Sequence, residues 1–245
     1  MTDRPDTPAD LRTQTVGAIV TRDYRTAAVF ERHGIDFCCG GDVALGDACV
    51  AARVDLEQVQ KDLAHATATA PAAHDDDVTS WTLTQLIDHI DAAHHTYVRE
   101  NAPRIGALAR KIEQVHGAHH PELAEISAVY GDMAAALMTH LDDEERVFFP
   151  AIKRAEAATR AGEAVDPADA DTLRTGVGQL AAEHDEVGGA LHRIRDLAMG
   201  YALPPDACAT YDLTFRSLRE FEADIHRHVH LENNILLPGM AALIA

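Results

Sequence analysis

The stretches HLDDEERVFFP (residues 140–150) and HVHLENNILLP (residues 228–238) decide the fold, because they repeat one pattern. In each, a histidine is followed by a glutamate four residues later, and a proline closes the stretch. Residues four apart lie on one face of an α-helix, so each histidine and its glutamate point in the same direction. Each pair also interrupts a stripe of hydrophobic residues spaced by three and four. Two helices therefore carry polar pairs that are expected to face the protein core.

Four long helices are predicted in this part of the chain, at about residues 82–116, 121–156, 167–201 and 205–237. The short loops between them favour an up-down-up-down four-helix bundle. Pro150 is expected to bend the second helix, and Pro238-Gly239 to end the fourth. No segment shows the sustained polar-apolar alternation of a strand, so the predicted fold class is all-α.

Polar residues interrupt the inward stripe of every helix. In the second, third and fourth helices these are His140 with Glu144, His184, and His228 with Glu232. Val147 is expected to continue the stripe of the second helix. The first helix is ambiguous, because the residues before its two histidines place His94 on the stripe, whereas the residues after them place His95 there. The pattern Ala-Ala-x-His-x-x-Val, shared by residues 92–98 and 181–187, selects His95 and leaves His94 as an outer partner or a solvent-facing residue.

Carboxylates are costly to bury. An unpaired carboxylate in a core costs several kcal/mol, and two enter this one. Ion pairing of each glutamate with a protonated histidine is one explanation, but a second copy of the pair on a separate stripe favours a shared metal. Four imidazoles and two carboxylates exceed a tetrahedral zinc site and suit two iron or manganese ions with both glutamates bridging. The open positions would accept an oxo or hydroxo bridge and a small molecule.

A smaller helical domain is predicted before the bundle. Residues 11–65 contain two amphipathic stretches around a CCGGD turn, residues 66–80 (ATATAPAAHDDDVTS) are expected to form a linker, and residues 81–245 form the bundle. In the turn, nearby backbone amides are expected to favour the thiolate of Cys38 and Cys39. These cysteines are interpreted as a redox or metal-transfer dithiol, with a buried packing pair as the alternative.

Composition excludes some functions. The formal net charge is −19 and the pI is about 5.0, so phosphate backbones and anionic lipid surfaces are poor partners. The longest apolar run is far shorter than a membrane span, and the polar stretch MTDRPDTPAD does not resemble a secretory signal. A cytoplasmic location is expected.

The sequence resembles the RIC family (repair of iron centres), whose members combine a double-cysteine domain with a haemerythrin-like di-iron bundle. The resemblance covers nearly the whole chain and rests on four motifs, His33-Gly-Ile-Asp-Phe-Cys-Cys-Gly-Gly41, Ile87-Asp-His-Ile90, Glu183-His-Asp-Glu186 and His228-x-x-x-Glu-Asn-Asn234. It implies two non-haem irons held by His95, His140, Glu144, His184, His228 and Glu232, with Cys38 and Cys39 functional. Only the choice of His95 depends on the family.

The resemblance also implies a role, which is repair of iron-sulfur clusters after nitrosative or oxidative damage by donation of iron. Damaged iron-sulfur proteins are then the partners, and nitric oxide or oxygen the small ligand. Two alternatives stay open: reduction of nitric oxide to nitrous oxide at the two irons, and a sensor that binds oxygen or nitric oxide reversibly. This chain has Ala134–Ala136 where a family member has acidic residues, so Glu183 or Asp91 is expected to replace them. His226 and His230 are expected to face solvent.

Overall fold

The computed structural model describes residues 11–68 and 78–245. The described residues form helices, turns and loops with one isolated β-bridge, between Thr15 and Ala44. The all-α prediction is confirmed. The chain divides into two compact units: one contains the residues up to Thr82 together with His230–Pro238, and the other contains Leu83–Val229 and Gly239–Ala245.

The first unit is built from short helices around a small core. Its N-terminal elements are η1 (Leu11–Thr13), α1 (Val16–Arg22), η2 (Tyr24–Thr26), α2 (Ala27–Arg32), α3 (Leu45–Ala52) and α4 (Leu56–Ala68). Thr15 caps α1, because its side chain accepts a hydrogen bond of 3.3 Å from the Ala18 amide. Val16, Phe30 and Leu45 are fully buried, so α1, α2 and α3 share one apolar centre.

The predicted linker, residues 66–80, falls partly outside the described residues. Helix α4 continues to Ala68, and the short helix η4 (Val78–Ser80) occupies the other end of the predicted segment. Residues 69–77 are not described. The boundaries 11–65, 66–80 and 81–245 stay a prediction.

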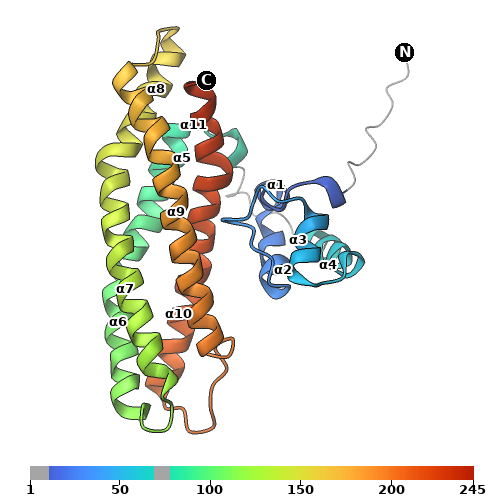
Figure 1. Cartoon of the computed structure of the whole chain (residues 1–245), viewed down its shortest axis with the longest axis vertical. Helices are drawn as coiled ribbons and strands as arrows, with labels where there is room; N and C mark the ends of the chain where they lie inside the picture. The colour runs from blue at the N-terminus through green and yellow to red at the C-terminus, as the bar shows by residue number, and fades with distance from the viewer. Residues whose placement is uncertain (1–10, 69–77) are drawn as a thin grey trace. The chain divides into compact units, whose positions relative to one another are not determined.

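From Leu83 onward, four rods, each an unbroken run of helical elements, follow one another (Figure 1). They are α5 (Leu83–His89), η5 (Ile90–His95) and α6 (Thr96–His116); α7 (Glu122–Asp143), η6 (Glu144–Phe148) and α8 (Phe149–Ala161); α9 (Pro167–Leu197); and α10 (Ala209–Leu231), which continues as η7 (Glu232–Leu236) and α11 (Leu237–Leu243). Loops at alternate ends join consecutive rods, which therefore run antiparallel. The predicted up-down-up-down four-helix bundle is confirmed. Within the described residues, no helix is both long and apolar enough to span a membrane.

Both ends predicted for the fourth helix are wrong. The helix begins at Ala209 instead of Pro205, because the Ala207 amide donates to the Pro204 carbonyl at 3.0 Å and closes a turn there. At the other end Pro238 does not stop the rod but occupies the second position of α11. Proline fits the first turn of a helix, where its missing N–H is not required. Pro150 occupies the equivalent position in α8.

Three of the rods contain a π-helix, and these are η5, η6 and η7. A π turn inserts one residue into an α-helix and rotates everything after it, so the inward stripe changes phase. Val147, predicted to face the core, is 52% exposed, and Phe148 is buried in its place. The prediction for Val147 is wrong because it assumed an unbroken α period through η6.

Candidate metal centre

Each rod contributes one histidine to the middle of the bundle. His95 is the last residue of η5, His140 lies in α7, His184 in α9 and His228 in α10. All four are at most 4% exposed. Imidazoles are seldom buried this completely without partners, so their contacts indicate what they do.

The four imidazoles form two close pairs. The Nε2 atoms of His95 and His228 are 3.2 Å apart, and so are the Nε2 atoms of His140 and His184. Two nitrogen donors at right angles around one ion, each about 2.1 Å from it, lie roughly 3 Å apart. Each pair therefore has the spacing of two ligands on a common metal ion.

Two glutamates connect the pairs. Glu144, the first residue of η6, is 1% exposed, and Glu232, the first residue of η7, is fully buried. Glu144 Oε2 is 3.4 Å from His95 Nε2 and also 3.4 Å from His140 Nε2, so one carboxylate faces both pairs.

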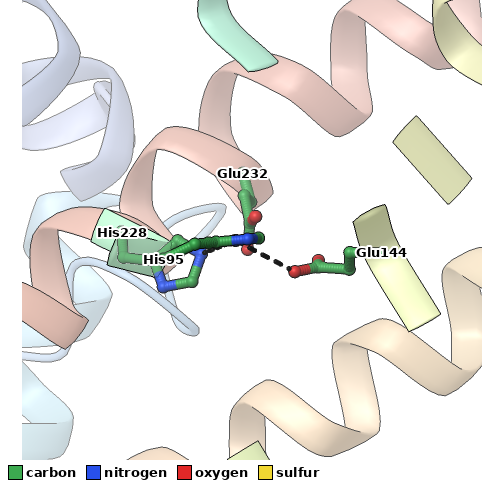
Figure 2. A group of neighbouring side chains, drawn as sticks. All are labelled: His95, Glu144, His228 and Glu232. Carbon is green, nitrogen blue, oxygen red and sulfur yellow. Dashed lines mark hydrogen bonds and ion pairs between the residues drawn. The ribbon is translucent and has the colours of Figure 1, made fainter. Parts of the chain in front are cut away.

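The six predicted ligands form two groups in which all ligand atoms lie within 4.8 Å of one another. His95 and His228 make up one group with the two glutamates, and His140 and His184 make up the other with the same two glutamates. In the first group the side chains converge on one point (Figure 2). Nitrogen and carboxylate donors with no thiolate, two of them shared, suit a di-iron site.

Carboxylates outside the two groups orient one histidine of each pair. His95 Nδ1 donates to Glu145 Oε1 at 2.9 Å, and His140 Nδ1 donates to Glu183 Oε2 at 2.6 Å. A proton held on Nδ1 leaves the lone pair of Nε2 directed at the other ligands. Both rings are therefore in the tautomer that binds metal through Nε2.

These two outer carboxylates are ionised under ordinary conditions. Partial burial raises the pKa of Glu145, but hydrogen bonds from Arg99 and His95 outweigh it and hold that pKa below its usual range. Burial likewise raises the pKa of Glu183, and hydrogen bonds from Gln179 and His140 more than reverse the effect. Ionised acceptors strengthen both bonds to imidazole. Glu183 was anticipated as a functional carboxylate, whereas Glu145 was missed, although it directly follows the ligand candidate Glu144.

The ambiguity between His94 and His95 has a structural cause. Both lie at the end of η5 and both are buried, because the π turn rotates the stripe that precedes it relative to the stripe that follows it. His94 donates from Nδ1 to Asp224 at 2.9 Å, and its ring stacks on His228 with centroids 5.7 Å apart. His94 is therefore an outer partner of a candidate ligand, one of the two roles that the sequence left open.

The expectation that His226 and His230 face solvent is wrong. They are 5% and 1% exposed. His230 Nε2 is 3.3 Å from the Thr21 hydroxyl, and its ring packs against Phe37. Periodicity correctly placed His230 off the inward-facing stripe of its helix. It could not show that Thr21 and Phe37 contact the His230 side chain.

A groove of about 610 Å³ lies beside the second histidine pair. Residues of α7 and α9 line it: Val129, Asp132, Met133, Ala136, Leu137, Thr139, His140, Glu183, Glu186, Val187 and Ala190. Its floor of Met133, Leu137 and Val187 is buried, whereas Asp132 and Glu186 are exposed. The groove therefore connects an acidic surface to His140.

The double-cysteine turn joins α2 to α3 in the first unit. Cys38 is buried and Cys39 half-buried, and their sulfurs are 4.0 Å apart, so they are thiols and not a disulfide. Asp36 Oδ1 accepts hydrogen bonds of 3.0 Å from both cysteine amides. Asn234 donates to the Cys38 carbonyl at 3.1 Å, and a Cβ on Gly41 would collide with the Asn234 side chain, which explains a glycine in this turn.

The expectation of a thiolate at Cys38 is wrong. A hydrogen bond with Cys39, then burial, then the charge of Asp36 raise the pKa of the Cys38 thiol well above its usual value. The backbone amides that were expected to stabilise a thiolate donate to Asp36 instead. Asp36, Cys38 and Cys39 nevertheless form a third group of ligand atoms within 4.8 Å of one another. A cation bound there would favour deprotonation of the thiols.

Comparisons with known proteins match both parts of the chain. A family model described as a domain of unknown function (DUF542, ScdA_N) matches residues 12–67, and the haemerythrin HHE cation-binding domain matches residues 85–239. The protein named iron-sulfur cluster repair protein YtfE from Yersinia pestis (strain Pestoides F) is 31% identical over 232 residues, which cover 94% of this chain and 97% of that protein. The protein of the same name from Yersinia pseudotuberculosis (serotype O:1b, strain IP 31758) shows the same identity and coverage.

Proposed function

Because the chain belongs to the RIC family of iron-sulfur cluster repair proteins, we propose that it repairs iron-sulfur clusters damaged by nitrosative or oxidative stress. The observation that carries the proposal is the sharing of Glu144 and Glu232 by two histidine pairs in a buried core. The family relationship supports a role in cluster repair. The shared set of imidazole and carboxylate donors supports the metal binding on which that role depends.

The proposed ligands are the six residues of the two groups. His95 and His228 would hold one iron, His140 and His184 would hold the other, and Glu144 and Glu232 would be shared by both. A bound pair of irons supplies one-electron chemistry and, in the ferrous state, iron that can be transferred. Open coordination positions would accept nitric oxide or oxygen.

The chain's own residues prepare this site. Glu145 and Glu183 keep a proton on Nδ1 of two ligands, so that Nε2 binds the metal. The two bridging carboxylates and the outer pair offset the positive charge of the ions in a core where water cannot. Phe149, stacked on His95 with ring centroids 5.4 Å apart, contributes apolar cover.

We propose that Cys38 and Cys39, with Asp36, receive iron during repair. Their ligand atoms lie close enough to share a cation, and a metal would lower the pKa that burial and Asp36 raise. The partners are damaged iron-sulfur proteins. A cytoplasmic location belongs to the proposal and is supported by four cysteines that form no disulfide.

The test combines metal analysis with a repair assay. Purified protein loaded anaerobically with ⁵⁷Fe should hold two irons per chain with the Mössbauer spectrum of a coupled pair. It should then reactivate a [4Fe–4S] hydratase that nitric oxide has inactivated, and lose iron as it does so. One zinc per chain, or reactivation no faster than with free ferrous iron, would contradict the proposal. Release of nitrous oxide over several turnovers without loss of iron would favour the reductase alternative.

A further inference from the structure

The two histidine pairs have different neighbouring residues, and this difference bears on how readily a metal ion can leave each pair. We propose that the ion between His140 and His184 exchanges readily, whereas the ion between His95 and His228 is retained. This inference rests on the di-iron centre proposed above and deepens it by identifying the iron that is donated.

A hydrogen-bonded network of Arg99, Asp142 and Glu145, here called the clamp, spans two rods and holds His95 of the first pair. Glu145 in η6 accepts the Nδ1–H of His95, and Arg99 in α6 donates to Glu145 at 2.9 Å and to Asp142 in α7 at 2.8 Å. Arg99 lies one turn after His95, so a single guanidinium fixes the carboxylate that orients the ligand on its own rod. The His95 ring can leave the metal only if this network opens.

Stacked rings add to the restraint on the first pair. Phe149 stacks on His95 with an interplanar angle of 22°, and His94 stacks on His228 with an interplanar angle of 3°. His94 is 4% exposed and is itself held by Asp224. Rotation of either ligand would break a ring contact in a close-packed core, where a moving side chain has no space to enter.

The second pair is held in a different way. Glu183, which accepts the Nδ1–H of His140, receives its other hydrogen bond from Gln179 at 2.8 Å, and both residues belong to α9. Glu183, the outer partner of His140, is therefore held by a neutral amide of its own rod, whereas Glu145 is held by a charged group that joins two rods. A neutral donor stabilises a carboxylate less than a guanidinium does.

The groove between α7 and α9 provides a path from this pair to solvent. The buried His140 and the half-buried Glu183 line it together with the exposed Asp132 and Glu186. Carboxylates along a path lower the electrostatic energy of a divalent cation that moves through it. Space beside His140 also allows that ring to turn and water to replace it on the metal.

Iron release from the full chain tests the inference. The ferrous, fully loaded protein is mixed anaerobically with excess ferrozine, and the absorbance of the iron complex is followed. Two phases of one iron each are expected. Two phases can also arise from sequential loss at equivalent positions, so selective variants assign them.

Arg99→Ala removes the clamp without changing a ligand. It should accelerate the slow phase by about 10–100-fold, the usual effect of losing an outer partner of a metal ligand, and leave the fast phase unchanged. Arg193→Ala is the matched control, because Arg193 pairs with Glu125 across α9 and α7 and both residues are half exposed. Both phases should be unchanged in this control.

Ala136→Phe fills the groove without touching the clamp. It should slow the fast phase at least about tenfold and spare the slow one, since the outer partners of His95 remain. Circular dichroism and iron content verify that each variant is folded and loaded before release is measured.

Three results would overturn the inference: a single release phase in the unchanged protein, acceleration of the fast phase by Arg99→Ala, or slowing of the slow phase by Ala136→Phe. A coupled di-iron Mössbauer spectrum together with any of these refutes the inference and leaves the proposed function intact. A chain that binds no iron pair refutes the proposed function itself.

Discussion

At the scale of single residues, two adjacent glutamates of the candidate metal centre have different roles. Glu144 faces both histidine pairs, whereas Glu145 points to the Nδ1 side of His95 and to Arg99. The π turn that begins at Glu144 sets this division, because the wider turn changes the angle between successive side chains. The two residues therefore form a matched pair for mutation.

Glu144→Ala should reduce the iron content from two ions to fewer than one per chain, because it removes the ligand common to both groups. Glu145→Ala should keep two irons at saturation and weaken the affinity for the ion between His95 and His228 by about 10–100-fold. Plasma emission analysis after dialysis against graded chelator measures both effects. Equal iron loss in the two variants would show that Glu144 is not shared.

The cysteine turn gives a second prediction at this scale. Cys38→Ser with Cys39→Ser should leave the iron content unchanged, since neither residue belongs to the two histidine groups. Repair of the inactivated hydratase should fall to the rate that free ferrous iron supports. Cys208→Ser is the control, because Cys208 is an exposed cysteine outside the turn. Full repair by the double variant would show that repair does not require the two cysteines.

At the scale of elements, the π-helices determine which residues reach the centre. Three of the six ligand candidates, His95, Glu144 and Glu232, stand at one end of a π-helix. The sequence contained one sign of a π-helix, because the apolar stripe of the first rod changes phase between His94 and His95. A change of phase inside an otherwise regular apolar stripe therefore predicts a π turn from the amino-acid sequence.

Deleting Val147, an exposed residue of η6, should convert the π turn to an ordinary α turn. The residues after the turn would keep their present faces, because the π turn accommodates one extra residue, but the angle between Glu144 and Glu145 inside the turn would change, so Glu144 could no longer face both histidine pairs. Iron content should fall below one per chain while far-ultraviolet circular dichroism stays nearly unchanged. Val147→Ala is the control and should bind two irons. Normal iron content after the deletion would show that the π turn is dispensable.

The start of α5 provides a stability prediction. Glu156, in α8, accepts hydrogen bonds from the Leu83 and Thr84 amides at 2.9 Å and 3.0 Å, so it caps a helix on a neighbouring rod. Glu156→Gln should lower the free energy of unfolding by about 1–2 kcal/mol at pH 7. Urea unfolding measures this, and Glu163→Gln, on an exposed loop residue, should change it little.

The effect of Glu156 should also depend on pH. Burial raises its pKa, but hydrogen bonds from Thr84 and Leu83 outweigh burial and leave the pKa below its usual value. A carboxyl whose folded pKa is lowered stabilises the fold above its unfolded pKa of about 4.3 and loses that contribution as pH falls through the folded value. The difference between Glu156→Gln and the unchanged protein should shrink below about pH 4. A constant difference at acid pH would assign the effect to packing.

At the scale of the whole molecule, the metal pair and the fold depend on each other. Buried carboxylates and imidazoles from all four rods meet in the middle of the bundle. Each unpaired buried charge costs several kcal/mol, and bound ions remove that cost. Removal of iron by chelation should therefore lower the melting temperature by roughly 10 °C, as 1 kcal/mol corresponds to about 2–4 °C at this chain length.

Differential scanning calorimetry of the apo and reloaded protein measures the effect of iron. Readdition of ferrous iron should restore the melting temperature, because the loss is a binding linkage and not a chemical change. An apo protein as stable as the loaded form would mean that the six side chains satisfy one another without a metal.

The amino-acid pattern was enough to predict the helices, the bundle and five of the six candidate ligands, because a fixed period of 3.6 residues projects a one-dimensional pattern onto a face. His95 was chosen by the internal repeat and the family resemblance. The sequence could not supply Glu145, Arg99 and Asp142 as the support of His95, since their roles depend on which rods are neighbours. It also could not show that His226 and His230 are covered, or that the two histidine pairs have different surroundings. Only the tertiary structure decided these points, because periodicity specifies the direction in which a side chain points and not what it meets.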